Sequence, residues 1–173
     1  MHSVPSDPCS KLLSSALLQR LGDAAAEARR WGEALRHWNR ALAADPPPPS
    51  ASVLHEQMAQ AHLELGDSWR AIQSATKAVE TRPAWAPAHL TLARAQLAFG
   101  EPELALSTAE AAFKLAPESE EAAGEVAGIR VLVLKRAAAG AGAAGQRLQV
   151  RQAAVGVQQG AADGEREQDA AAG

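Results

Sequence analysis

The segment SVLHEQMAQAHLELGDSWRAIQSATKAVETRPAW, which runs from Ser52 to Trp85, decides the fold because the segment after it repeats its pattern. That second segment, APAHLTLARAQLAFGEPELALSTAEAAFKLAP, runs from Ala86 to Pro117. Identical residues recur at a constant offset of 34 positions, and the pairs are His55 and His89, Ala59 and Ala93, Ala61 and Ala95, Leu63 and Leu97, Gly66 and Gly100, Ala71 and Ala105, Ala75 and Ala109, Ala78 and Ala112, and Pro83 and Pro117. Small residues, a turn glycine and a closing proline at a fixed period predict a helical repeat array.

The period and the order of these residues resemble the tetratricopeptide repeat. The resemblance implies two antiparallel helices in each repeat and a stack of repeats that forms a right-handed α-solenoid with a concave inner face. We therefore expect an all-α protein of three helix pairs, closed by a C-terminal capping helix. The resemblance also implies a surface that binds protein or peptide partners.

A diverged copy of the repeat precedes the other two. When this copy is aligned through Ala34 and Ala71, Gly22 falls on Ala59, and the offset is 37 rather than 34. The three extra residues lie in the run Pro46-Pro47-Pro48-Pro49-Ser50. A polyproline segment can lengthen a connection without disturbing either helix, so we expect a spacer here. The alternative is a ligand for a reader of Pro-rich motifs, but the run lacks a flanking basic residue to orient it.

The pattern predicts three parts along the chain. Residues 1–9 are expected to be disordered, residues 10–136 to form the repeat domain, and residues 137–173 to form a low-complexity, disordered tail with a weak helix near 146–155. The repeats cover about 15–48, 52–85 and 86–119. The expected helices span about 10–28, 32–44, 52–65, 68–81, 86–99 and 102–115, with the capping helix over about 118–136. The composition of the tail also fits the product of an alternative exon.

Composition limits the classes of function. The 173 residues carry a formal net charge of -3, which gives no electrostatic reason to expect binding to nucleic acid or to a membrane surface. No stretch approaches the roughly 20 apolar residues that a transmembrane helix requires. Cys9 is the single cysteine and cannot form an internal disulfide, which fits a reducing compartment. We expect an intracellular protein, either cytoplasmic or nuclear.

The sequence gives no support for catalysis, a cofactor or a metal site. His55 and His62 share a helix face but are separated by about two turns, roughly 10 Å, which is too far for one metal ion. Cys9 has no histidine nearby that could activate it as a nucleophile. The four tryptophans, Trp31, Trp38, Trp69 and Trp85, are expected to fill gaps between repeats rather than to anchor a partner. We therefore predict that the chain is not an enzyme.

The candidate site is the concave face, which the first helix of each repeat lines in this family. The residues placed there are Gln19, Asp23, Glu56, Gln57, Gln60, Leu90, Thr91 and Arg94, flanked by Arg20, Glu27 and Glu64. This face is polar and is acidic toward the first two repeats. It is predicted to bind an extended or helical peptide of basic or amide character. A solvated inner face without a ligand is the alternative.

One subset of the family clamps the C-terminal carboxylates of cytosolic chaperones with Lys, Asn and Arg side chains. The matching positions here hold Gln19, Asp23, Gln57, Pro87 and Thr91, none of which agrees with that pattern. Asp23 would repel the carboxylates that such a clamp binds. We therefore expect an interaction module or scaffold that does not bind chaperone C-termini. The alternatives are a co-chaperone that uses another mode of binding, or an isoform without an independent function.

Overall fold

The computed structural model describes residues 8–44 and 46–139, which form helices joined by short turns. The helices of the three repeats are α1 (Pro8–Glu27), α2 (Trp31–Ala43), α3 (Pro48–Glu64), α4 (Ser68–Thr81), α5 (Ala86–Phe99) and α6 (Pro102–Leu115). A further helix, the C-terminal helix, covers residues 120–139. Contacts divide the chain into two units, Met1–Arg130 and Val131–Gly173, and the packing described below is that of the first unit.

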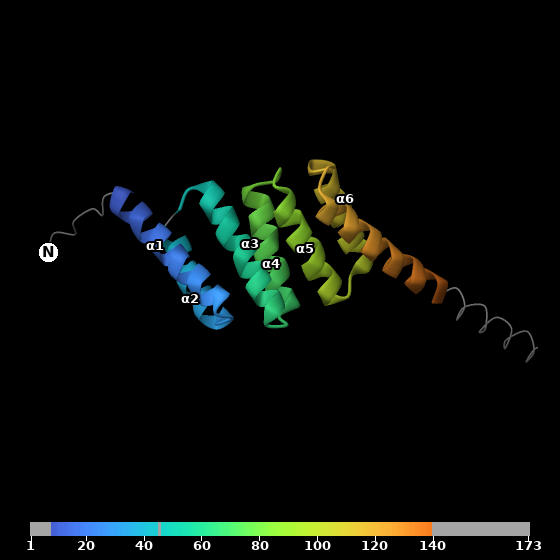
Figure 1. The fold of residues 1–173 in the computed structure, drawn as a ribbon, viewed down its shortest axis with the longest axis horizontal. Helices are drawn as coiled ribbons and strands as arrows, with labels where there is room; N and C mark the ends of the chain where they lie inside the picture. Colours follow the sequence, from blue (N-terminus) through green and yellow to red (C-terminus); the bar gives the residue numbers. More distant parts are fainter. Residues whose placement is uncertain (1–7, 45, 140–173) are drawn as a thin grey trace, which may run out of the picture. The chain divides into compact units, whose positions relative to one another are not determined.

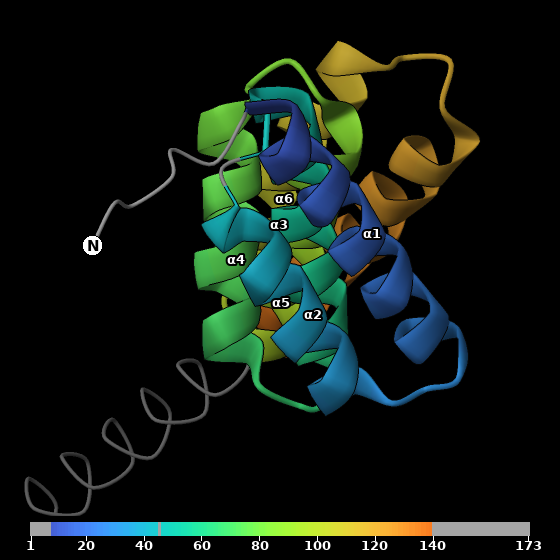
Figure 2. The ribbon, with the colours of Figure 1, turned by 90° about the vertical axis from the view of Figure 1, so that its left-hand side faces the viewer.

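The helices of the first unit pack as consecutive pairs, α1 with α2, α3 with α4 and α5 with α6 (Figure 1). Neighbouring pairs stack because α2 packs against α3, α4 packs against α5, and α3 also contacts α5. Figure 2 looks along this stack from the end that carries α1 and α2, so that the later pairs lie behind them. The predicted all-α solenoid of helix pairs is confirmed. No helix in the described part of the chain is long and apolar enough to cross a bilayer.

The helix boundaries follow the prediction closely from α4 to α6, whereas α3 begins four residues earlier than the predicted residue 52. Pro47 is the N-cap of α3, and its carbonyl oxygen accepts hydrogen bonds from the backbone amides of Ser50 and Ala51 at 2.9 and 3.0 Å. Proline suits the first turn of a helix because the N–H that it lacks would have no intrahelical partner. The spacer prediction was therefore wrong for the second half of the proline run, which forms the first turn of α3.

Two of the predictions for the chain ends fall largely on residues that the structure does not describe. Residues 1–9 were predicted to be disordered, but α1 begins at Pro8, so the prediction was wrong for Pro8 and Cys9, and residues 1–7 lie outside the described residues. The tail was predicted to be disordered from residue 137, but residues 137–139 are helical, and the rest of the tail, with the predicted weak helix near 146–155, lies outside the described residues. The C-terminal helix itself starts at residue 120 and extends through 139.

Paired helices approach closely where their side chains are small. Ala59, Ala71, Ala93 and Ala105 have no exposed surface, as expected for residues between the two helices of a repeat. The first repeat has different side chains between its two helices. Trp38 occupies the position of Ala75 and Ala109 in the later repeats, and it is almost completely buried.

The large Trp38 side chain fits only because its neighbour on α1 is Gly22. A Cβ atom added at Gly22 would lie 2.3 Å from Trp38 Nε1 and 2.4 Å from Trp38 Cδ1, well inside van der Waals contact. The first repeat therefore pairs glycine with tryptophan where the second and third repeats pair alanine with alanine. Trp38 also joins the first core cluster, which contains Ala25, Ala34 and Leu54.

The turn between the paired helices requires a left-handed backbone. Gly66 and Gly100 adopt it with φ of 74° and 98°, at no steric cost because glycine has no Cβ. The equivalent residue in the first repeat is Arg29, which has φ of 56° and is the only non-glycine residue with positive φ in the described part of the chain. Its Nη2 atom lies 3.4 Å from Glu64 Oε2. An L-amino acid with a left-handed backbone conformation costs roughly 1 to 2 kcal/mol. The turn at Arg29 is therefore strained, whereas the turns at Gly66 and Gly100 are not.

Gly22→Ala is expected to lower the free energy of unfolding by about 1 to 3 kcal/mol, because the new methyl group overlaps the Trp38 ring. Chemical denaturation would measure the change. Gly32→Ala is the matched control, since a Cβ atom there meets nothing within 4 Å. The Gly22→Ala penalty should shrink in a Trp38→Leu background, and an equal penalty in both backgrounds would refute the steric explanation.

Arg29→Gly is expected to raise the free energy of unfolding by up to about 1 kcal/mol, because it relieves the left-handed strain. Arg29→Ala removes the same side chain and its contact with Glu64 but keeps a Cβ atom, so it serves as the control. Thermal melts of the two variants should differ in favour of glycine. Equal stability of the two variants would show that the turn is not strained.

Candidate functional site

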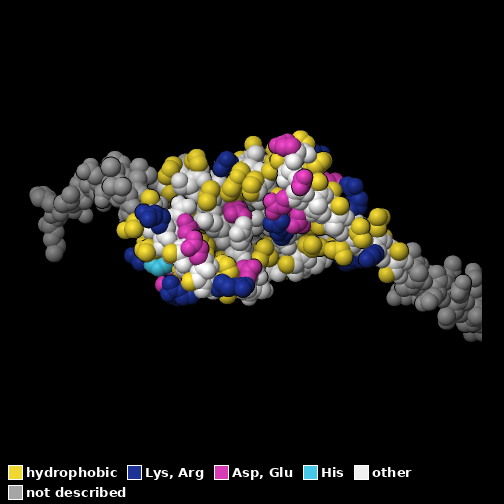
Figure 3. All heavy atoms as spheres, in the orientation of Figure 1, with side chains coloured by type: hydrophobic (Ala, Val, Ile, Leu, Met, Phe, Trp, Pro, Cys, Tyr) yellow, Lys and Arg dark blue, Asp and Glu magenta, His cyan; other side chains and the backbone are white. Residues whose placement is uncertain are grey.

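The predicted site residues lie on the three first helices of the repeats, α1, α3 and α5, which form what we call the inner face. Gln19 and Asp23 lie on α1, Glu56, Gln57 and Gln60 on α3, and Leu90, Thr91 and Arg94 on α5. Figure 3 shows the molecule in the orientation of Figure 1, with acidic side chains spread over the middle of this view and enclosing a smaller basic cluster. Polar contacts between successive helices bring most of the predicted residues together.

Asp23 joins the first two repeats. Its Oδ1 atom accepts a hydrogen bond from Trp38 Nε1 and another from Gln57 Nε2, both at 3.0 Å. The carboxylate is therefore held by a side chain of its own repeat and by one of the next. This arrangement fixes a carboxylate on the inner face at the junction of the first two repeats.

Glu56 joins the second and third repeats. Thr91 Oγ1 donates to Glu56 Oε1 at 2.6 Å, and Gln60 Nε2 donates to the same oxygen. The Glu56 side chain is buried, and burial raises the pKa of its carboxyl group, while the hydrogen bonds from Thr91 and Gln60 act in the opposite direction. Glu56 therefore bonds to side chains of its own helix and of the next repeat, and both Glu56 and Thr91 are buried.

Arg94 joins the third repeat to the C-terminal helix. Its Nε atom lies 2.6 Å from Glu125 Oε1, and its Nη2 atom lies 2.8 Å from Glu121 Oε1. Two carboxylates therefore surround the single cation of α5, and this part of the inner face is negative overall. The sequence pattern predicted that Arg94 lies on the inner face, but it did not predict these two partners. Both glutamates lie about 30 residues from Arg94, on the helix that was predicted only to cap the repeats.

A pocket of about 240 Å³ opens between α1 and α3. Carboxylates, side-chain amides and two indole rings line it, and the lining residues are Asp23, Ala26, Glu27, Trp31, Trp38, Gln57 and Gln60. Gln57 Oε1 is buried and has no hydrogen-bond partner among the described residues. The pocket therefore offers two carboxylates beside the partly exposed Trp31, whereas Gln57 Oε1 and Trp38 are themselves buried.

The other residues predicted from the sequence differ in how buried they are and in whether they line the pocket. Gln19 is half-buried on α1 and has no place in the pocket lining. Leu90 is only 4% exposed and packs with Ala112 and Ala122 in a core cluster, so its side chain is not presented to a ligand. Trp31 and Trp38 were predicted to fill gaps between repeats, and both also line the pocket. The change from Ala75 and Ala109 to tryptophan at position 38 was the sequence signal that could have identified this pocket.

Histidine is not organised for metal binding in the described part of the chain, where no group of three or more potential ligands gathers. Burial lowers the pKa of His55, and the nearby Lys77 adds to the effect. Burial also lowers the pKa of His62, while the nearby Asp67 carboxylate acts in the opposite direction and Arg70 acts with burial. His89 Nε2 lies 2.8 Å from the backbone oxygen of Pro83. His62 Nδ1 is buried without a hydrogen-bond partner among the described residues.

Comparison with known proteins gives the same fold. Tetratricopeptide repeat protein 33 of Xenopus laevis is 32% identical over 107 residues, which cover 62% of this chain and 40% of that protein. Tetratricopeptide repeat protein 33 of Danio rerio is 40% identical over 82 residues, which cover 47% of this chain and 30% of that protein. The chain thus spans two fifths or less of the length of the curated relatives it matches. No protein-family model matches the chain.

Among solved structures, the first tetratricopeptide repeat domain of Spaghetti (RPAP3), bound to the HSP90 peptide SRMEEVD, superposes with a TM-score of 0.66 at 22% identity. The match covers 71% of this chain and 95% of that domain. The resemblance to tetratricopeptide repeat proteins that the sequence indicated is therefore confirmed at the level of the fold. At 22% identity, the superposition shows that the two folds are alike and does not identify a ligand for this chain.

Glu56→Gln is expected to remove a pH dependence of stability. The ordinary pKa of the carboxyl group is 4.5, and its folded-state pKa is higher, so the folded chain binds more protons between these two values. The contribution of Glu56 to the free energy of unfolding is therefore complete below pH 4.5 and decreases as the pH rises through the folded pKa. Denaturation from pH 4 to 8 should show Glu56→Gln gaining stability relative to the wild type across this window.

The exposed Glu80 on α4 provides the control, as Glu80→Gln. The difference in stability between Glu80→Gln and the wild type should stay nearly constant over the same pH range. A constant difference for Glu56→Gln as well would contradict the assignment of Glu56 as a buried carboxyl that resists ionisation.

Proposed function

Because the chain has the fold of tetratricopeptide repeat proteins, we propose that it is a protein-interaction module whose inner face binds a peptide segment carrying a Lys or Arg side chain. The basic side chain enters the pocket between α1 and α3. The observation that carries this proposal is that the Asp23 and Glu27 carboxylates line one pocket whose lining contains no cationic residue among the described residues. A Lys or Arg side chain of the ligand would supply the missing positive charge.

The aromatic lining favours a cation over a neutral donor. Trp31 is partly exposed at the pocket, and an indole face attracts a guanidinium or ammonium group by about 0.5 to 2 kcal/mol. Trp38 is almost completely buried and contributes by donating a hydrogen bond to Asp23. Asp23 is fixed by two hydrogen bonds, so its charge is positioned before a ligand arrives. Glu27 is exposed and makes no ion pair among the described residues, which leaves its carboxylate available to the ligand.

The charge of the inner face argues against an acidic ligand. Spaghetti binds the peptide SRMEEVD, which contains two glutamates and an aspartate. Here Asp23 lies at one end of the inner face, and Glu121 and Glu125 enclose Arg94 at the other. An acidic peptide would therefore meet like charge at both ends of the groove. A non-enzymatic scaffold role is proposed together with this ligand preference.

Glu27→Lys is expected to weaken binding of a basic peptide by about three- to tenfold, because it replaces attraction in the pocket by repulsion. The probe is a set of fluorescent peptides that differ only in one central residue, which is Arg, Lys, Gln or Glu. Anisotropy titrations with the wild type should rank Arg and Lys above Gln, and Gln above Glu. Glu80→Lys on α4 adds the same charge away from the pocket and should change these affinities little.

The peptide MEEVD, which is SRMEEVD without its serine and arginine, serves as a competitor in the same titrations. Failure of this peptide to displace the Arg peptide is the expected result. Tighter binding of MEEVD than of the Arg peptide would overturn the proposal and favour a co-chaperone that binds acidic C-termini. Equal binding of all four central residues would show that the pocket does not select a ligand.

A further inference from the structure

The C-terminal helix continues the register of the repeats. Residues 120–133 follow α5 at the offset of 34 that separates 86–99 from 52–65. In this register Ala127 corresponds to Ala93 and Ala59, and Ala123 to His89. The C-terminal helix therefore stands in the position of the first helix of a fourth repeat.

Exposure shows that the partner of this helix is missing from the described residues. Ala59 and Ala93 have no exposed surface, because α4 and α6 pack on the helices that carry them. Ala127 occupies the same repeat position but is exposed. The turn glycine at 66 and 100 is replaced by Leu134, and the C-terminal helix continues through residue 139 instead of turning back.

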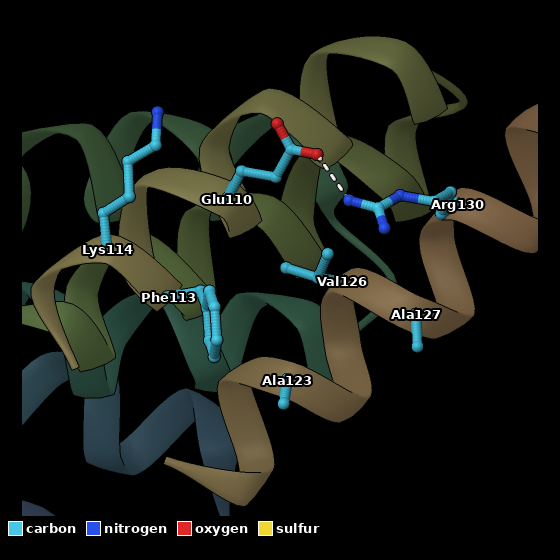
Figure 4. Close-up of a pocket in the computed structure, with 7 residues that line it drawn as sticks. All are labelled: Glu110, Phe113, Lys114, Ala123, Val126, Ala127 and Arg130. Atoms are coloured by element: carbon cyan, nitrogen blue, oxygen red, sulfur yellow. Dashed lines mark hydrogen bonds and ion pairs between the residues drawn. The ribbon is translucent and has the colours of Figure 1, made fainter. Parts of the chain in front are cut away.

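A groove of about 470 Å³ lies between α6 and the C-terminal helix (Figure 4). The residues that line it are Glu110, Phe113, Lys114, Ala123, Val126, Ala127 and Arg130. Figure 4 shows the Phe113 ring and the Val126 side chain between the two helices, with Ala123 and Ala127 along the C-terminal helix. Small side chains on one wall allow a further helix to approach closely.

The rim of the groove carries an excess of positive charge. Arg130 Nη2 lies 2.9 Å from Glu110 Oε1, so these two charges offset each other. Lys114 is exposed and makes no ion pair or hydrogen bond among the described residues. Figure 4 shows its side chain apart from the Glu110–Arg130 pair. The remaining charge therefore favours a carboxylate on whatever fills the groove.

We propose that this groove binds an amphipathic helix of another protein, with small residues at intervals of three and four on its contact face and a carboxylate that reaches Lys114. Two helices of the chain itself, α4 and α6, have the features proposed for this ligand. α4 and α6 meet their partner helices with fully buried small residues, Ala71, Ala75 and Ala78 in one and Ala105, Ala109 and Ala112 in the other. The groove is separate from the pocket between α1 and α3, so this site does not depend on the proposed function.

The test uses a synthetic peptide with the sequence of α6, Pro102–Leu115, because this sequence has the required small residues and two glutamates against one lysine. Amide chemical shifts of the full chain are followed by NMR during titration with this peptide. Shifts are expected at Ala123, Ala127 and Lys114 and not on α1. Ala127→Gln should weaken binding by about tenfold, since the longer side chain fills the space that the peptide needs.

Gly128→Gln introduces the same side chain at the next residue, where a Cβ atom meets nothing within 4 Å and which does not line the groove. It should leave the affinity unchanged, whereas Lys114→Glu should weaken binding by at least about threefold at low salt. Absence of binding by the α6 peptide, or equal binding by wild type and Ala127→Gln, would overturn the proposal. A wild-type dimer that Ala127→Gln converts to a monomer would instead assign the groove to a second copy and would also overturn it.

Discussion

The close approach of the two helices in each repeat is the constraint on which the rest of the structure depends. It requires small residues at the crossing, and the second and third repeats meet this requirement with alanine on both helices. The first repeat reaches the same spacing with Gly22 and Trp38. The Trp38 ring also lines the pocket between α1 and α3. The replacement of alanine by tryptophan at this position therefore forms one wall of that pocket.

Polar contacts between successive first helices give the inner face its character. Gln57 bonds to Asp23, Thr91 bonds to Glu56, and the C-terminal helix provides the carboxylates that hold Arg94. Each contact links one repeat to the next and satisfies polar groups that would be costly to leave unpaired in a partly buried place. Most polar side chains of this face therefore bond to neighbouring helices of the stack.

The two proposed binding sites differ in chemistry because they arise from different features of the repeat. The inner-face pocket combines carboxylates with aromatic rings and suits a single basic side chain. The groove beside the C-terminal helix is largely apolar with a basic rim, and it suits a whole helix. The two proposals together assign two ligand segments of opposite charge to one chain.

The sequence by itself determined the helical repeat, the register of α4 to α6 and the residues of the inner face, because these depend on local spacing that recurs every 34 residues. Only the tertiary structure decided which of those residues remain available. Leu90 is in the core, Glu56 is covered by Thr91, and Arg94 is enclosed by two glutamates. Availability depends on contacts between helices about 30 residues apart, and a periodic pattern identifies a face without specifying what packs against it.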